Sequence, residues 1–186
     1  MENLLQAVER HKELILAAER YIWQHPETGY REVNTCAYMV ERFKELGYDN
    51  LVMAGDIPGF YTVVDTGKAG PEVLVLAEMD SLVCPNHPDS DPKTGYVHAC
   101  GHNVQCAAML GIAGALKDKE VLGRMCGKIR LCAVPAEELL EIEFRNNLIN
   151  VFLMIFGILP CPFYVFFVFF RYIIPVNVLI KKNTKH

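Results

Sequence analysis

Hydrophobic residues recur at helical spacing in the first part of the chain and predict an amphipathic helix over residues 2–24. The apolar positions that define this helix are Leu4, Leu5, Val8, Leu14, Ile15, Ala18 and Ile22. Residues 25–32 contain proline and glycine and are expected to form a loop. A second helix is predicted over residues 33–46, and Gly47 is a suitable residue to end it.

Three later segments have the hydrophobic patterns of strands. Residues 60–65 are β-branched and aromatic, whereas residues 73–77 and 129–134 are continuous apolar runs, typical of strands covered on both faces. Between them, residues 84–95 are rich in turn-forming residues, and residues 104–116 predict a buried helix. Strands that alternate with helices indicate the α/β class, a layered domain with a mostly parallel sheet flanked by helices.

The last part of the chain differs in composition from the rest. We predict one domain over residues 1–149 and an apolar tail over residues 150–186, which holds seven of the ten phenylalanines. Residues 151–170 carry no charge and are long enough for a membrane span, although two central prolines weaken a straight helix. Basic residues follow this segment, so the positive-inside rule would require export of the acidic domain. An aberrant, read-through-like tail is the favoured interpretation, with a membrane segment and a buried core segment as alternatives.

Charge and cysteine content narrow the class of protein. Through Ile149 the chain carries 14 basic and 22 acidic residues, and it has no basic stripe, so nucleic acid is not an expected partner. The seven cysteines are scattered, which favours free thiols in a reducing compartment. Because the amino terminus is charged and lacks the pattern of a secretory signal, we expect a cytoplasmic protein. Membrane association is expected only through residues 151–170.

Residues suited to catalysis are concentrated in three short stretches. Two follow the apolar runs at 73–77 and 129–134, and one precedes the helix at 104–116. Because ligands of open α/β sheets bind beyond the carboxyl ends of the strands, these stretches are expected to form one site. The candidate site residues are Glu78, Asp80, Cys100, His102, Glu137 and Glu138.

A metal site is one interpretation of these residues. Cys100 and His102 are separated by one glycine, a spacing that lets both side chains point the same way in an extended or turn segment. Thiolate and imidazole are preferred ligands of zinc and similar divalent ions. The alternative is a buried thiol beside an incidental histidine.

The adjacent carboxylates Glu137 and Glu138 suit metal-assisted hydrolysis. Adjacent side chains normally point apart, so one can hold a metal while the other takes a proton from water. A solvated acidic helix start is the alternative interpretation. Glu78 and Asp80 could orient the ligands, or they could be a polar strand end.

The stretches AEMDSL, HACGHN and AVPAEE occur in this order after HPETGYRE. Together they resemble the metallopeptidase family of aminoacylases, N-acyl-amino-acid amidohydrolases and aminobenzoyl-glutamate hydrolases, over about residues 5–149. The resemblance implies a zinc-peptidase-like catalytic domain with Glu137 as general base. It implies Cys100, His102 and Glu138 as metal ligands, and Asp80 as a supporting residue. Asn103 stands where many members of the family have aspartate.

The resemblance also implies partners and cofactors. Family members use divalent metal, either zinc, manganese or cobalt, with two ions in intact proteins that form homodimers. The implied substrate is a small N-acyl-amino acid or dipeptide, cleaved at its amide bond.

This chain departs from the family pattern after Glu138. Family members have a second domain, two later histidine ligands and a histidine that polarises the scissile carbonyl, whereas this chain has only His186 after that point. We therefore expect a truncated, incomplete amidohydrolase. The alternatives are a non-catalytic α/β fragment, with or without a membrane tether, and a thiol enzyme that uses Cys100 with His102.

Overall fold

The computed structural model describes residues 2–138 of the chain. The tail at 150–186, its candidate membrane segment at 151–170, and the last residues of the predicted domain at 139–149 lie outside the described residues. Among the described helices, none is long and apolar enough to cross a membrane.

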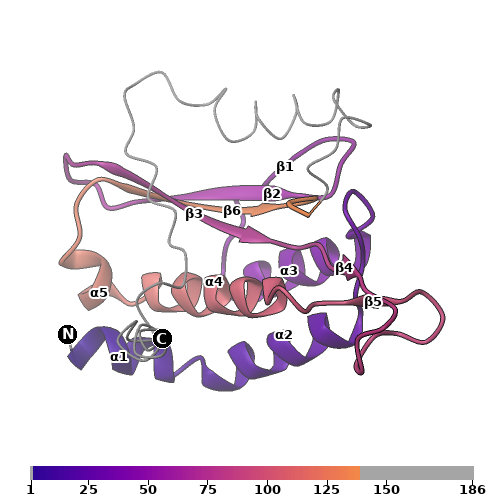
Figure 1. Ribbon diagram of the computed structural model, residues 1–186. Helices are drawn as coiled ribbons and strands as arrows, with labels where there is room; N and C mark the ends of the chain where they lie inside the picture. The colour runs from indigo at the N-terminus through magenta and orange to yellow at the C-terminus, as the bar shows by residue number, and fades with distance from the viewer. Residues whose placement is uncertain (1, 139–186) are drawn as a thin grey trace, which may run out of the picture.

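Helices and strands alternate along the described residues, which confirms the α/β class (Figure 1). The helices are α1 (Glu2–Glu9), α2 (Lys12–Gln24), α3 (Val33–Glu45), α4 (His102–Leu116) and α5 (Lys119–Gly123). The strands are β1 (Val52–Met53), β2 (Phe60–Asp65), β3 (Glu72–Glu78), β4 (Leu82–Val83), β5 (Tyr96–Val97) and β6 (Lys128–Val134).

The main sheet has the strand order β1-β2-β6-β3 and is mixed. Strand β6 is parallel to β3 and antiparallel to β2, and β1 is antiparallel to β2. The expectation of a mostly parallel sheet is corrected by this topology. Residues 66–71 alone connect β2 to β3, and a parallel crossover needs a dozen or more residues. The two strands therefore run in opposite directions, with β6 between them.

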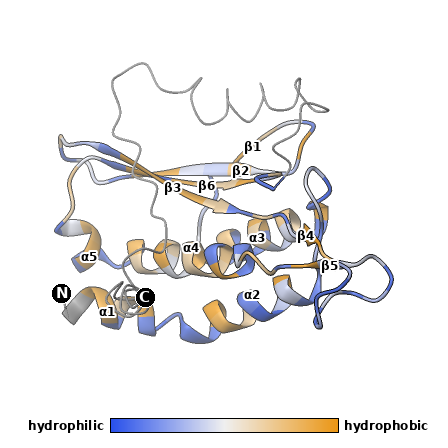
Figure 2. Cartoon of the chain, in the orientation of Figure 1, coloured by the Kyte–Doolittle hydropathy of each residue, from blue (hydrophilic) through white to orange (hydrophobic). Residues whose placement is uncertain are grey.

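The described helices cover one face of this sheet (Figure 1). Helix α4 lies between the sheet and α2 and contacts both layers. It is largely hydrophobic, whereas α2 has mixed hydropathy (Figure 2). The core between the layers includes the fully buried Ile22, Phe43, Phe60 and Leu110, and the rings of Phe43 and Phe60 meet edge to face with centroids 5.1 Å apart.

The prediction of one helix over residues 2–24 was wrong at its middle. The backbone leaves the helical conformation at His11, with φ −104° and ψ 12°, so that α1 and α2 are separate. The His11 ring packs against Gly114 of α4, where an added Cβ would lie 2.5 Å from the ring. This contact depends on a residue about a hundred positions away, and local hydrophobic spacing does not reveal it.

Candidate metal centre

Strands β3 and β6 end together, and this places the predicted site residues at one edge of the sheet. Glu78 pairs with Val134 in the parallel ladder, and the N–H of Met79 donates to the carbonyl oxygen of Val134 at 3.0 Å. Asp80 therefore follows one strand at the edge where Glu137 follows the other. The structure brings together the stretches that the sequence predicted to converge.

Helix α4 begins at the same edge. Gly101 precedes it with φ +89°, a left-handed conformation that suits a residue without a Cβ. The turn places His102 at the first position of α4, where the imidazole is almost fully buried. The predicted start of this helix at residue 104 is thus two residues late.

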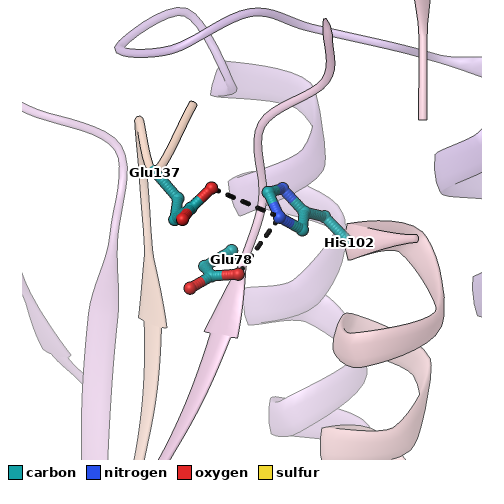
Figure 3. Close-up of side chains that lie close together, drawn as sticks. All are labelled: Glu78, His102 and Glu137. Atoms are coloured by element: carbon teal, nitrogen blue, oxygen red, sulfur yellow. Dashed lines mark ion pairs between the residues drawn. The ribbon is translucent and has the colours of Figure 1, made fainter. Parts of the chain in front are cut away.

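The two nitrogens of His102 face different partners. Nδ1 lies 2.8 Å from the backbone oxygen of Asp80 and 3.2 Å from its Oδ1. Nε2 lies 3.1 Å from Oε2 of Glu78, 3.8 Å from Oε2 of Glu137 and 3.9 Å from Oε1 of Glu138. Figure 3 shows His102 pointing toward Glu78 and Glu137, which come from β3 and from the residues after β6. The imidazole thus has one anchored nitrogen and one nitrogen in a group of carboxylates.

Three side chains satisfy the geometry of a metal-binding group. One ligand atom each from Glu78, His102 and Glu137 lies within 4.8 Å of the other two. Glu78 is oriented by α4, because its Oε2 accepts from Nε2 of Gln105 at 3.0 Å. Of the ligands predicted from the sequence, only His102 belongs to this group. Glu78, which was predicted to support the ligands, is itself a member of the group.

The other two predicted ligands border this group. The backbone N–H of Glu138 donates to Oδ2 of Asp80 at 2.8 Å, which ties the residue to the segment after β3. The thiol of Cys100 is exposed and makes a hydrogen bond with the Glu138 side chain. Cys100 and Glu138 therefore lie next to each other at the rim of the cluster.

The acidic surroundings shift the pKa values of the site. Burial lowers the pKa of His102, but hydrogen bonds with Asp80 and Glu78 outweigh burial and raise it to about 10. The hydrogen bond with Glu138, together with burial, raises the pKa of Cys100 to about 11. Burial and the neighbouring carboxylates of Glu78 and Glu138 raise the pKa of Glu137. Without a metal ion, His102 is therefore a cation and Cys100 a neutral thiol at neutral pH.

Two polar residues of the HACGHN stretch received no role from the sequence. His98 is buried, and neither ring nitrogen has a hydrogen-bond partner among the described residues. Burial lowers the pKa of His98 to about 4, so its ring is neutral. Asn103 donates from Nδ2 to Oε1 of Glu19 on α2 at 2.9 Å. The available signals were their position near Cys100 and His102 and, for Asn103, its place where many family members have aspartate, and neither specifies a contact.

The donor set fits a divalent metal ion. Carboxylate oxygens and an imidazole nitrogen suit zinc, manganese and cobalt, and a thiol at the rim favours zinc among them. Nε2 of His102 is directed into the carboxylate group while Nδ1 is fixed by Asp80. This is the usual arrangement of a metal-binding histidine, whose second nitrogen is oriented by a carboxylate or carbonyl.

Known proteins are similar in sequence to this part of the chain. Thermostable carboxypeptidase 1 of Saccharolobus solfataricus is 32% identical over 142 residues, which cover 74% of this chain and 35% of the relative. N-acetyl-L-cysteine deacetylase of Bacillus subtilis is 32% identical over 127 residues, covering 67% and 30%. The homologues of this chain are M20-family amidohydrolases. The family resemblance inferred from the motifs is thereby confirmed.

The fold agrees with that of an M20 peptidase. The YXEP protein of Bacillus subtilis, a dinuclear metal-binding peptidase of this family, matches with a TM-score of 0.63 and 23% identity. The match covers 78% of this chain and 40% of that protein. No protein-family model matches the chain. The chain spans about a third of the length of the curated M20 relatives that it matches.

Proposed function

We propose that this chain supplies part of a divalent-metal site for hydrolysis of an amide bond in an N-acyl-amino acid or small peptide. The observation that carries the proposal is the orientation of His102, with Nδ1 on Asp80 and Nε2 among carboxylates. The names of the relatives, a carboxypeptidase and an N-acetyl-L-cysteine deacetylase, support amide hydrolysis. The dinuclear M20 peptidase supports the use of divalent metal.

Exposure and hydrogen bonding support different roles for the two adjacent glutamates. The Glu138 side chain is 21% exposed and its backbone is tied to Asp80, so it is suited to hold a metal with Cys100 and His102. The Glu137 side chain is 44% exposed and its pKa is raised, so it is suited to exchange protons with solvent and substrate. Glu78 is a further candidate ligand, because its carboxylate lies nearer to Nε2 of His102 than the carboxylates of Glu137 and Glu138 do.

The reaction assigns one task to each of these groups. A divalent ion at this position supplies Lewis acidity toward water and the scissile carbonyl. A carboxylate oxygen of Glu137 accepts the proton of the attacking water and then passes it to the leaving amine. Asp80 keeps His102 in one orientation during both steps. The chain spans about a third of the length of its relatives, so we propose that it supplies only part of the site.

The proposal extends to the identity of the metal and to the location of the protein. We propose zinc, manganese or cobalt as the metal and a cytoplasmic location. Homodimer formation is proposed only for intact relatives, and membrane association only through residues 151–170.

Metal titration of single variants tests the proposed ligands. Calorimetric titration with zinc is expected to give weaker binding for Cys100→Ala, His102→Ala and Glu138→Gln than for the parent chain. Glu78→Gln decides whether Glu78 is a ligand. Matched controls are Cys126→Ala and Glu13→Gln, which change an exposed thiol and an exposed carboxylate elsewhere. Equal affinity of the ligand variants and the controls would contradict the assignment.

Activity is tested separately with an N-acyl-amino acid and zinc, manganese or cobalt. The 186-residue chain is expected to show very low turnover, since loss of one oxyanion-stabilising group typically costs about 10²–10³ in rate. Grafting the remaining part of an M20 relative after residue 138 is expected to raise turnover, and Glu137→Gln is expected to abolish it. Rapid turnover by the short chain, unaffected by Glu137→Gln, would contradict the mechanism.

A further inference from the structure

The turn that carries Glu137 and Glu138 has an unusual backbone. Ala136 has φ +62°, in the left-handed region that residues with a Cβ rarely adopt. The residue is buried, and it directly follows the proline after β6. A strained conformation of this kind persists where surrounding contacts determine it.

The main contact on this turn comes from a distant carboxyl group. The N–H of Ala136 donates to Oε1 of Glu32 at 2.8 Å, and the Glu32 side chain is fully buried. Two residues further on, the N–H of Glu138 donates to Oδ2 of Asp80 at 2.8 Å. Two carboxyl groups thus hold alternate amides of the turn, and Glu137 lies between the two held residues.

Glu32 belongs to a loop that is itself firmly placed. The carboxylate of Glu27 accepts hydrogen bonds from the N–H groups of Asn34 and Thr35 at 3.1 and 2.8 Å. It thereby provides acceptors for N–H groups in the first turn of α3, which have no partner within the helix. The backbone oxygen of Glu27 accepts from the N–H of Ser81 at 2.8 Å. The loop at 27–32 therefore contacts two of the three segments that supply the site, one through Ser81 and the other through Ala136.

We propose that Glu32 is a positioning residue, whose buried carboxyl fixes the left-handed turn at Ala136 and thereby places Glu137 and Glu138 beside His102. Glu32 precedes α3 as its N-cap residue, yet its side chain does not cap that helix. The importance of the two glutamates rests on the proposed function, whereas the hydrogen bond to Ala136 does not.

A neutral carboxyl group is sufficient for this role. Burial raises the pKa of Glu32 to about 8, and Oε2 has no hydrogen-bond partner among the described residues. Glutamine keeps an acceptor oxygen and the same size. Glu32→Gln is therefore the conservative variant, and Glu32→Met has similar length, suits a buried position and removes the acceptor.

Amide hydrogen exchange of the metal-free 186-residue chain tests the hydrogen bond directly. We expect the Ala136 amide to exchange at least about tenfold faster in Glu32→Met and within about threefold of the parent rate in Glu32→Gln. Amides of Leu131 and Cys132 in β6 report global stability. Thr62→Val is the control, because it removes a part-buried hydrogen bond of 2.9 Å to Asn50 that involves neither Glu32 nor Ala136.

Zinc affinity of the same variants provides the second readout. Affinity is expected to fall about tenfold or more in Glu32→Met and to stay within about threefold of the parent value in Glu32→Gln and Thr62→Val. If the parent chain binds no zinc, the proposed function fails while the exchange result still decides the role of Glu32. Parent-like exchange of Ala136 in Glu32→Met would overturn the inference. Equal acceleration of all amides in Glu32→Met would also overturn it. So would an equal loss of zinc affinity in Glu32→Gln and Glu32→Met.

Discussion

Asp80 holds His102 at two points, with its backbone oxygen 2.8 Å and its Oδ1 3.2 Å from Nδ1 of the imidazole. The other carboxylate oxygen of Asp80 accepts the N–H of Glu138 at 2.8 Å. One fully buried carboxylate thus orients two proposed ligands that lie far apart in the sequence.

Removal of this carboxylate is expected to weaken metal binding without removal of a ligand. Asp80→Ala should lower zinc affinity about 10- to 100-fold, the usual effect of losing a group that orients a metal-bound histidine. Calorimetric titration measures the effect, and Asp89→Ala in an exposed loop is the matched control. Similar affinities for these two variants would show that Asp80 does not orient the site.

Metal binding is expected to release protons. The pKa of His102 is raised to about 10, so below that pH its imidazole must lose a proton before Nε2 can bind a metal. Zinc affinity should therefore increase as the pH rises from 7 to 9. Calorimetry at pH 7.5 in buffers with different ionisation enthalpies counts the released protons.

The same count identifies the contribution of Cys100. The pKa of its thiol is raised to about 11, so binding through the thiolate adds a second released proton. We expect about two protons for the parent chain and about one for Cys100→Ala. A count independent of Cys100 would exclude the thiol from the ligand set.

Cys100 is also expected to react slowly with alkylating reagents in the metal-free protein. The thiolate is the reactive form, and the raised pKa leaves little of it at pH 7.5. Site-resolved mass spectrometry should show alkylation at least about tenfold slower than at Cys126, which is also exposed. Glu138→Gln should accelerate the reaction at Cys100. Faster alkylation of Cys100 than of Cys126 would instead favour the thiol-enzyme interpretation.

Packing between the helical layers makes a prediction about stability. Gly114→Ala places a Cβ about 2.5 Å from the His11 ring, so it should lower the free energy of unfolding by about 1–3 kcal/mol. Gly123→Ala is the control, since nothing lies within 4 Å of an added Cβ there. Urea unfolding measures both variants. Recovery of stability in the double variant with His11→Ala would confirm the contact, and parent-like stability of Gly114→Ala would contradict it.

The sequence predicted the elements whose patterns are locally determined. The apolar runs became β3 and β6 within one residue at each end, and Gly47, with φ +81°, follows α3 as expected. The site was predictable in outline because polar residues that follow two apolar strands meet at one edge when those strands are parallel neighbours.

Other features depend on contacts between distant residues, and these the sequence did not reveal. The direction of β2 follows from the short connection to β3, and the break at His11 follows from its contact with Gly114. The hydrogen bond from Ala136 to Glu32 joins residues about a hundred positions apart. Glu32 also precedes a helix, where a solvated acidic residue is common, so nothing in the sequence indicated that its side chain is buried.

The central position of β6 has a consequence for synthesis on the ribosome. Among the described strands β6 comes last in the sequence, yet it pairs with both β2 and β3. Neither of those strands can form its long ladder until residues 128–134 have left the exit tunnel. The nascent chain must carry two apolar strands without their central partner, the type of intermediate that chaperones recognise. Sheet formation in this chain is therefore a late event, because it requires pairing between strands that are far apart in the sequence.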